Sequence, residues 1–290
     1  RRGMMDIRVK RKKVLKEIVK YTLMVLLAAI LLFPFFVMLT RSFMTWKEAT
    51  SYPVQILPEK LNFASYGEAI SGDFFVYLKN TLIVLIVNVV GVTLSAYVVA
   101  YGFARIRFRG NGVLFAIALS TMMLPGIVSQ VPLYVFYSKI GWLNTLLPLT
   151  IPPLFGGGMI NIFLIRQYLR SIPQSYNEAA RIDGASELRT CLEVIMPLVK
   201  PVLFLTAVNT FMACWNDFTT PLMYIDSSAP QKYTLAIGVY QRFRGAQSFK
   251  DKAPNVQMAL CVLMMIPSLI IFSLFQRTLI EGVSITGLKG

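Results

Sequence analysis

The residues with the clearest chemical role lie between positions 174 and 201, in a polar stretch of mixed charge that separates two long apolar runs. This stretch contains Glu178, Ala179 and Ala180, followed by Gly184. The two alanines let a partner surface approach closely, and the Glu178 carboxylate can pair with a basic side chain of that partner. Such chemistry serves recognition of another protein rather than bond making. We therefore interpret the stretch as a docking element.

The docking stretch is predicted to form two short helices joined at a glycine. Ser171 and Gln174 have the spacing of a capping box, which places the start of the first helix near position 172. Gly184 is expected to end that helix, because glycine takes the left-handed conformation at a helix C-terminus without a Cβ penalty. Ser186 and Glu187 then suit the start of the second helix.

Helical geometry also predicts which side chains of the first helix lie together. Residues three and four apart share a face, and this relation gathers Tyr176, Ala179, Ala180 and Asp183. The helix would be roughly 15 Å long, enough to lie in a groove on another protein. An ordinary amphipathic surface helix is the alternative, and the membrane setting of the stretch favours docking.

The composition is that of a polytopic membrane protein. Hydrophobic residues make up 56% of the 290 residues and the mean hydropathy is +0.60, whereas soluble domains have about 45–50% apolar residues. The net charge of +15 is concentrated beside apolar runs, which indicates membrane orientation rather than nucleic-acid binding. The chain has no histidine, and its carboxylates lie mostly in loops, so we expect no catalytic site and no metal site. Free structural thiols are expected at Cys191, Cys214 and Cys261.

Apolar runs near the roughly 20 residues needed to cross the hydrocarbon core predict six membrane spans. The predicted spans are 21–39, 81–104, 113–135, 146–165, 201–224 and 256–275. The first run is too long for a cleavable signal peptide. With both termini inside, 19 of the 29 Lys and Arg residues lie on the inner side, in agreement with the positive-inside rule.

This topology divides the chain into three parts. Residues 1–20 form a basic cytoplasmic segment, residues 21–280 form the six-helix transmembrane domain, and residues 281–290 form a cytoplasmic tail. The docking loop 170–200 lies in the cytoplasm between spans 4 and 5. The outer segments 41–79 and 225–255 are expected to be loops with short helices.

Helix breakers are frequent in the later spans, with Pro125 and Pro132 in the third, Gly156–Gly158 in the fourth, Pro221 in the fifth and Pro267 in the sixth. A proline inside a helix removes a backbone hydrogen bond and kinks the helix. Both static packing irregularity and hinges of a moving pathway fit this pattern.

Asp217 is the only charged side chain inside the six spans as drawn. Charged residues are costly in lipid, so they face the interior of a helix bundle and serve function by default. A polar stripe on the fifth span is predicted to line a solute path, with Asn209, Ala213, Asn216, Asp217 and Thr220. Polar contacts between helices, worth about 0.6–2 kcal/mol each, are the alternative.

The second span has a different pattern, in which Thr81, Asn88, Ser95 and Gly102 recur every seven residues, with Gly91 nearby. Small residues at this spacing favour close helix packing over solute contact.

The docking stretch resembles the Glu-Ala-Ala loop of binding-protein-dependent ABC importer permeases. Two positions depart from the family's Ile-x-Leu-Pro ending, where Val194 and Met196 keep apolar side chains. The residues that carry the resemblance are Glu178, Ala179, Ala180, Gly184, Val194, Met196 and Pro197.

Two further segments resemble the maltose-type carbohydrate permeases of this superfamily. They are WNDFTTPLMYI at 215–225 and FQRTLIEGVSITGLKG at 275–290. The resemblance implies an all-α membrane protein with six transmembrane helices and a cytoplasmic coupling helix between spans 4 and 5, as in type I ABC importer permeases. It assigns ATPase coupling to Glu178, Ala179, Ala180, Arg181, Asp183 and Gly184.

The same resemblance implies partners. These are a second permease subunit that completes a heterodimer, two cytoplasmic ATPase subunits and an extracytoplasmic solute-binding protein, assembled in the cytoplasmic membrane of a bacterium or archaeon. Region 225–255 would face the binding protein, and residues 284–290 would reach the ATPases.

Sugar import by alternating access, with an oligosaccharide as the solute, is the function that the resemblance implies. The chain has no phosphate-loop motif. We therefore expect it to bind no cofactor, and ATP and Mg to be used by the partner ATPases. Two alternatives stay open, namely an importer for a peptide, polyamine or anion, and a membrane scaffold or sensor subunit that transports nothing.

Overall fold

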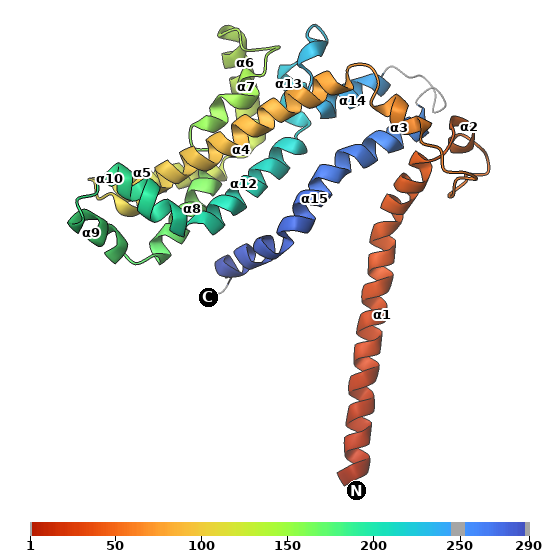
Figure 1. The fold of residues 1–290 in the computed structure, drawn as a ribbon, viewed down its shortest axis with the longest axis horizontal. Helices are drawn as coiled ribbons and strands as arrows, with labels where there is room; N and C mark the ends of the chain where they lie inside the picture. The colour runs from red at the N-terminus through yellow and green to blue at the C-terminus, as the bar shows by residue number, and fades with distance from the viewer. Residues whose placement is uncertain (1, 245–252, 288–290) are drawn as a thin grey trace. The chain divides into compact units, whose positions relative to one another are not determined.

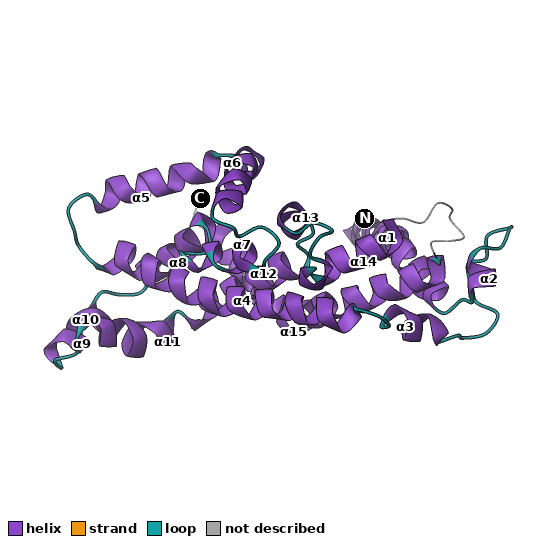
Figure 2. Ribbon diagram, turned by 90° about the horizontal axis from the view of Figure 1, so that it is seen from above, coloured by secondary structure: helices purple, strands orange, loops and turns teal. Residues whose placement is uncertain are grey.

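The computed structural model describes residues 2–244 and 253–287, and within these residues the chain is helical with no strand (Figures 1 and 2). Side chains are described over 13–244 and 253–276. The α-helices are α1 Arg2–Ser42, α2 Trp46–Ala49, α3 Ala64–Ala69, α4 Phe74–Arg105, α5 Asn111–Ser120, α6 Gly126–Lys139, α7 Leu147–Thr150, α8 Met159–Ser171, α9 Ser175–Ile182, α10 Glu187–Arg189, α11 Met196–Leu198, α12 Lys200–Trp215, α13 Thr219–Tyr224, α14 Leu235–Arg244 and α15 Pro254–Gly287.

Four helical segments of the described chain are long and apolar enough to cross a membrane. They are Lys13–Ser42, Phe74–Arg105, Leu147–Ser171 and Pro254–Gln276, which correspond to the predicted first, second, fourth and sixth spans. Two bent helix pairs raise the number to six if each pair is one span. The prediction of an all-α membrane protein is confirmed, and the third and fifth spans differ from their predicted form.

The third predicted span, 113–135, is bent. Its two parts, Asn111–Met123 and Gly126–Lys139, meet at 96°. Pro125 stands at the bend with ψ 129°, an extended conformation that interrupts the helix. Pro132 lies inside α6 without ending it. The breaker identified at Pro125 therefore produces a sharp bend inside the third predicted span.

The fifth predicted span, 201–224, is interrupted near its end. Helix α12 stops at Trp215 and α13 begins at Thr219, so Asp217 lies in the break. The ring of Pro221 would clash with the carbonyl four residues earlier, at Asp217, in a continuous helix. The breaker identified at Pro221 therefore coincides with an interruption of the fifth predicted span.

The chain forms two compact units. One comprises residues 1–71 with 246–265, and the other comprises residues 72–245 with 266–290. Helix α15 begins in the first unit and continues in the second. It runs to Gly287, so the predicted tail 281–290 is helical up to that residue, and positions 288–290 lie outside the described residues.

The first unit contains α1 with α2 and α3, the short helices expected in the outer segment 41–79. The side chains of α1 are exposed from Lys13 to Phe36, as suits a helix that contacts lipid or another chain. Polar contacts join the elements beyond α1, because Asn255 Nδ2 donates to Ser65 Oγ over 2.9 Å and Ser65 Oγ donates to Met44 O over 3.2 Å.

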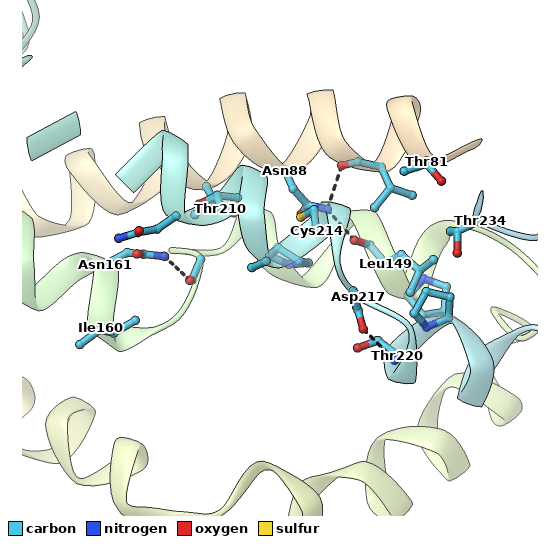
Figure 3. A pocket seen from close by; sticks show the side chains of 18 of the residues that line it. Thr81, Asn88, Leu149, Ile160, Asn161, Thr210, Cys214, Asp217, Thr220 and Thr234 are labelled. Carbon is cyan, nitrogen blue, oxygen red and sulfur yellow. Dashed lines mark hydrogen bonds between the residues drawn. The ribbon is translucent and has the colours of Figure 1, made fainter. Parts of the chain in front are cut away.

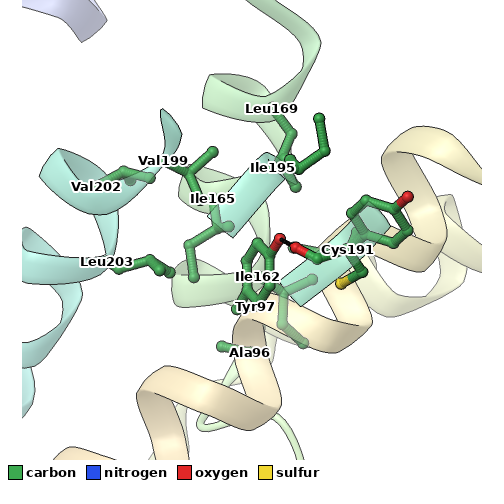
Figure 4. Packing of buried hydrophobic residues seen from close by; sticks show 12 residues of the cluster. Ala96, Tyr97, Ile162, Ile165, Leu169, Cys191, Ile195, Val199, Val202 and Leu203 are labelled. Atoms are coloured by element: carbon green, nitrogen blue, oxygen red, sulfur yellow. Dashed lines mark hydrogen bonds between the residues drawn. The ribbon is translucent and has the colours of Figure 1, made fainter. Parts of the chain in front are cut away.

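The second unit is built around α4, which packs against α8 and α12 (Figure 1). Its larger buried cluster, shown in Figure 4, contains Ala96, Tyr97, Ala100, Tyr101, Ile162, Ile165, Leu169, Cys191, Ile195, Val199, Val202 and Leu203. A Cβ at Gly91 would overlap the side chain of Leu154, which confirms the close packing predicted for the second span. The core thus holds α4 against both the docking loop and α12.

Candidate functional site

The stretch that was predicted to dock a partner folds as two short helices joined at a glycine. Helix α9 ends before Gly184, whose φ of +75° is the left-handed conformation that favours glycine. Gly184 N donates to Arg181 O over 3.0 Å, and Ala185 N donates to Ala180 O over 2.9 Å. Ser186 caps α10 by accepting a hydrogen bond from Arg189 N over 3.3 Å.

The start of the first docking helix differs from the prediction. Ser171 is the last residue of α8, and its hydroxyl donates to Tyr168 O over 2.7 Å. Ile172 is extended with ψ 132°, because a residue before proline is driven away from the helical conformation. Gln174 precedes α9 and makes no side-chain cap. The predicted capping box is therefore absent, and α9 begins at Ser175.

Helix α9 turns one of its two central alanines toward its own chain. Ala180 is 6% exposed and Asn177 is 5% exposed, whereas Ala179, Glu178 and Asp183 are exposed. The predicted face with two alanines is thus split. Ala179 is available to a partner, and Ala180 packs inward because an amphipathic helix buries one stripe against its own domain.

Three side chains on one face of α4, four residues apart, hold the docking loop. All three are donors to the loop or to its approach. The bonds run from Tyr97 Oη to Cys191 O (2.6 Å, Figure 4), from Tyr101 Oη to Glu187 Oε1 (2.7 Å), and from Arg105 Nη2 to Leu169 O and Ile172 O (2.8 and 2.9 Å). Sequence reasoning missed these residues. The spacing Tyr-x-x-x-Tyr-x-x-x-Arg at the end of an apolar span was the signal that pointed to them.

Tyr101 is the centre of this attachment. Its hydroxyl also accepts a hydrogen bond from Asn177 Nδ2 over 3.0 Å, so one tyrosine contacts both short helices of the loop. Arg181 pairs with the same Glu187 carboxylate at 3.0 Å, but their side chains are 62% and 37% exposed. Solvent-exposed ion pairs contribute little, so the buried tyrosine is the main anchor.

A cavity of about 460 Å³ lies farther along α4, between α4, the α7–α8 region, α12 and α13 (Figure 3). Four residues of the predicted solute path line it: Asn209, Ala213, Asp217 and Thr220. Asn216 does not line it, and its amide donates to Met212 O over 2.8 Å. The structure therefore brings together most of the predicted stripe, in spite of the helix break.

Asp217 has a local structural contact as well as a place on the cavity wall. Its Oδ1 accepts a hydrogen bond from Thr220 N over 3.0 Å at the start of α13 (Figure 3). Among the residues that line the cavity, all within the described chain, Asp217 is the only one with a charged side chain. The cavity thus presents one carboxylate among neutral groups.

Amides and hydroxyls supply the other polar groups of the cavity, and several come from outside the predicted stripe. Asn88 donates to Leu149 O over 2.9 Å, and Asn161 donates to Gly157 O over 2.7 Å. Thr81 and Asn88 make packing contacts with neighbouring segments and also line the cavity. Helix packing and solute contact, which the sequence pattern presents as alternatives for the second span, are therefore compatible at these two residues. The sequence did not predict Asn161 as a cavity residue, because the glycines at 156–158 make the start of α8 difficult to locate.

The α6–α7 connection and the segment after α13 form a separate polar contact. Asn144 Nδ2 donates to Asp226 Oδ2 over 3.1 Å, and Asp226 N donates to Asn144 Oδ1 over 2.9 Å. Hydrogen bonds from Ser228 and Asn144 lower the pKa of the Asp226 carboxyl. This exchange joins the α6–α7 connection to the segment after α13.

Comparison with known proteins places the chain among transport proteins. Residues 91–285 match the family described as the binding-protein-dependent transport system inner membrane component. The trehalose/maltose transport system permease protein MalG of Thermococcus litoralis is 31% identical, over 97% of this chain and 99% of that protein. The galactooligosaccharides transport system permease protein GanQ of Bacillus subtilis is 27% identical, over 97% and 98%.

A solved structure shows the same fold. It is a bacterial ABC transporter involved in the import of the acidic polysaccharide alginate, and the matched chain has a TM-score of 0.82 at 24% identity, with 92% of this chain and 97% of that chain covered. With the family match over two thirds of its length and relatives aligned along nearly all of it, the chain belongs to the inner membrane components of binding-protein-dependent transport systems.

Proposed function

We propose that this chain is a permease subunit of an ATP-driven importer that moves a sugar, most simply an oligosaccharide, into the cell by alternating access. The observation that carries the proposal is that α4 contacts two sites at once. At the C-terminal end of α4, Tyr97, Tyr101 and Arg105 hold the docking loop. Nearer its N-terminus, Thr81 and Asn88 line the polar cavity. The relatives described as trehalose/maltose and galactooligosaccharide permeases support a sugar as the solute.

The docking loop is the proposed site of ATPase coupling. Its exposed surface contains Glu178, Ala179 and Asp183, which a cytoplasmic ATPase would contact directly. Ala180 and Gly184 act differently, because Ala180 packs the helix inward and Gly184 sets the turn between α9 and α10. Arg181 steadies the loop through Glu187. When two ATPase subunits close on ATP and Mg, displacement of the loop is passed to α4 through the three anchors.

The cavity is the proposed part of the solute path that this chain contributes. Amide and hydroxyl groups of Asn161, Asn209 and Thr220 suit a polyhydroxylated solute, because each donates and accepts hydrogen bonds. A second permease subunit would supply the opposite wall, and an extracytoplasmic solute-binding protein would deliver the sugar. With both termini cytoplasmic, the docking loop faces the ATPases and the 225–255 region faces the binding protein.

The first experiment is a pull-down of the tagged chain from native membranes in mild detergent, with the copurifying proteins identified by mass spectrometry. Recovery of an ATPase, a second permease and a solute-binding protein supports the importer, and the solute retained by the binding protein identifies its class. If the binding protein retains a peptide, a polyamine or an anion, that solute class replaces sugar in the proposed function. Recovery of the chain alone from membranes in which it functions would contradict the proposal.

The coupling role is tested with Glu178→Lys. This change reverses the charge of an exposed side chain, so the protein should insert normally and lose ATPase association and sugar uptake. Lys200→Glu is the matched control, because Lys200 is an exposed residue beyond the two docking helices. Normal uptake by Glu178→Lys at normal expression would refute the coupling assignment.

A further inference from the structure

A second pocket, of about 430 Å³, lies between the end of α4 and the docking helix α9. Its lining is polar and carries both charge signs. The lining residues are Arg105, Ile106 and Arg107 at the end of α4, Gln174, Asn177, Glu178 and Arg181 in and just before α9, and Glu187 in α10. The pocket is distinct from the solute cavity, with which it shares no lining residue.

Two side chains that line this pocket each have a buried atom with no hydrogen-bond partner among the described residues. Arg105 is 8% exposed, and its Nε–H donates to no acceptor, although its Nη2 donates to the carbonyl oxygens of the α8 end. Asn177 is 5% exposed, and its Oδ1 accepts no hydrogen bond. A buried donor or acceptor left unpaired costs about 1–3 kcal/mol, and more when it is charged. Two residues of the pocket lining therefore each contain an unpaired buried atom, a donor in Arg105 and an acceptor in Asn177.

The charges of the pocket are also unbalanced. Arg181 and Glu187 pair with each other. Arg105 and Arg107 form no ion pair with any residue in the described chain, and Glu178 forms none there either. Two free guanidinium groups thus stand against one free carboxylate, and the carboxylate is on the exposed side of α9. The excess positive charge sits beside the buried Arg105.

We propose that this pocket binds a phosphate group that bears a hydrogen-bond donor, with its oxygens on Arg105 and Arg107 and its donor on Asn177 Oδ1. Guanidinium groups match the oxygens of phosphate with paired, charge-assisted hydrogen bonds. A simple carboxylate would satisfy Arg105 but would offer no donor to Asn177. The pocket volume is many times the ~30 Å³ share of one water molecule, so it accommodates a group of this size.

Two sources supply this chemistry. One is hydrogen phosphate or a soluble phosphomonoester, whose P–OH is the donor. The other is the phosphoethanolamine headgroup of a membrane lipid, whose ammonium is the donor. The pocket lies at the end of the α4 span, with the apolar side chain of Ile106 42% exposed at its edge, so a headgroup can reach it. Either occupant would join α4 to α9 and stabilise the docking loop.

The test uses the full chain, purified with the subunits that accompany it, in three forms: wild type, Arg107→Gln and Arg109→Gln. Arg109 is the matched control, because it lies in the same exposed connection and does not line the pocket. In one arm, inorganic phosphate is titrated at constant ionic strength and the thermal unfolding midpoint is measured. In the other arm, nanodiscs of phosphatidylethanolamine or phosphatidylcholine are compared, and retained lipid is counted by native mass spectrometry.

The expected result is binding that is about tenfold weaker in Arg107→Gln than in the wild type, as the loss of one charge-assisted contact implies, with Arg109→Gln unchanged. A response to inorganic phosphate identifies the soluble source. Retention of phosphatidylethanolamine in preference to phosphatidylcholine, which has no N–H donor, identifies the lipid source. Equal binding by all three forms, equal loss in both variants, or no binding of either probe would overturn the proposal.

Discussion

The Tyr101 hydroxyl lies 2.7 Å from the Glu187 carboxylate, and this contact joins the long helix α4 to the second short helix of the docking loop. Tyr101 is 3% exposed and the Glu187 side chain is 37% exposed, so the bond is partly shielded from solvent. The same hydroxyl accepts a hydrogen bond from Asn177 in the first short helix. Movement of either short helix is therefore transmitted to α4 at Tyr101.

Removal of that hydroxyl should weaken coupling without removing the ring. We expect Tyr101→Phe to destabilise the loop attachment by about 1–2 kcal/mol, because it leaves Asn177 and Glu187 without this partner. Sugar uptake should fall relative to ATP turnover while expression stays normal. Both rates are measured in reconstituted vesicles. Tyr134→Phe is the control, since Tyr134 is an exposed residue that stacks on Tyr224 away from the loop, and an equal effect there would count against the anchor.

The turn at Gly184 should not tolerate a side chain. Gly184 has φ +75°, and a Cβ added there would meet no atom within 4 Å, so Gly184→Ala introduces backbone strain of about 1–2 kcal/mol and no clash. We expect roughly five- to thirtyfold weaker retention of the ATPase in a pull-down. Gly112→Ala also meets open space, and its φ lies outside the left-handed range, so it should behave as wild type. Full retention by Gly184→Ala would show that the turn does not set the docking geometry.

A pair of substitutions separates the two roles of Asp217. Asp217→Asn keeps an oxygen that accepts from Thr220 N, whereas Asp217→Ala removes the acceptor and should cost about 0.5–2 kcal/mol at the start of α13. If the carboxylate contributes to the solute path, Asp217→Asn changes uptake kinetics at normal stability. Unchanged kinetics for Asp217→Asn, with reduced thermal stability for Asp217→Ala alone, would assign the residue to helix capping.

The Asn144–Asp226 contact predicts a weak pH dependence of stability. Its hydrogen bonds lower the pKa of Asp226 in the folded state, so their contribution is present above the unfolded pKa of about 3.9 and is lost as pH falls through the lower folded value. The thermal midpoint of Asp226→Asn should therefore differ from wild type at neutral pH and converge with it in acid. Glu59→Gln, in the other unit, is the control. A difference in thermal midpoint between wild type and Asp226→Asn that stayed constant down to the lowest pH would contradict the stabilising role of the Asp226 carboxylate.

Sequence alone determined the class of the protein and the turn between α9 and α10, the two helices of the proposed docking loop. Several apolar runs of about 20 residues are more than the interior of a chain of this size can bury, and each is long enough to cross the hydrocarbon core, which is why composition predicted a helical membrane protein. The turn at Gly184 and the Ser186 cap were predictable because they depend on local backbone chemistry, which neighbouring residues decide. The same reasoning failed at Ser171, where the extended Ile172 before Pro173 ended one helix before the next could begin.

Tertiary structure decided which side chains meet. Periodicity placed Ala179 and Ala180 on one face, and only packing against the rest of the chain selected Ala180 as the buried one. The anchors on α4 and their acceptors are more than sixty residues apart in sequence, and no local pattern encodes such a pairing. Likewise, four residues of the predicted stripe line one cavity although the helix is interrupted at Asp217, because α4, α8, α12 and α13 pack around that space. Local propensity sets where helices start and stop, while burial of the remaining surface sets which faces come together.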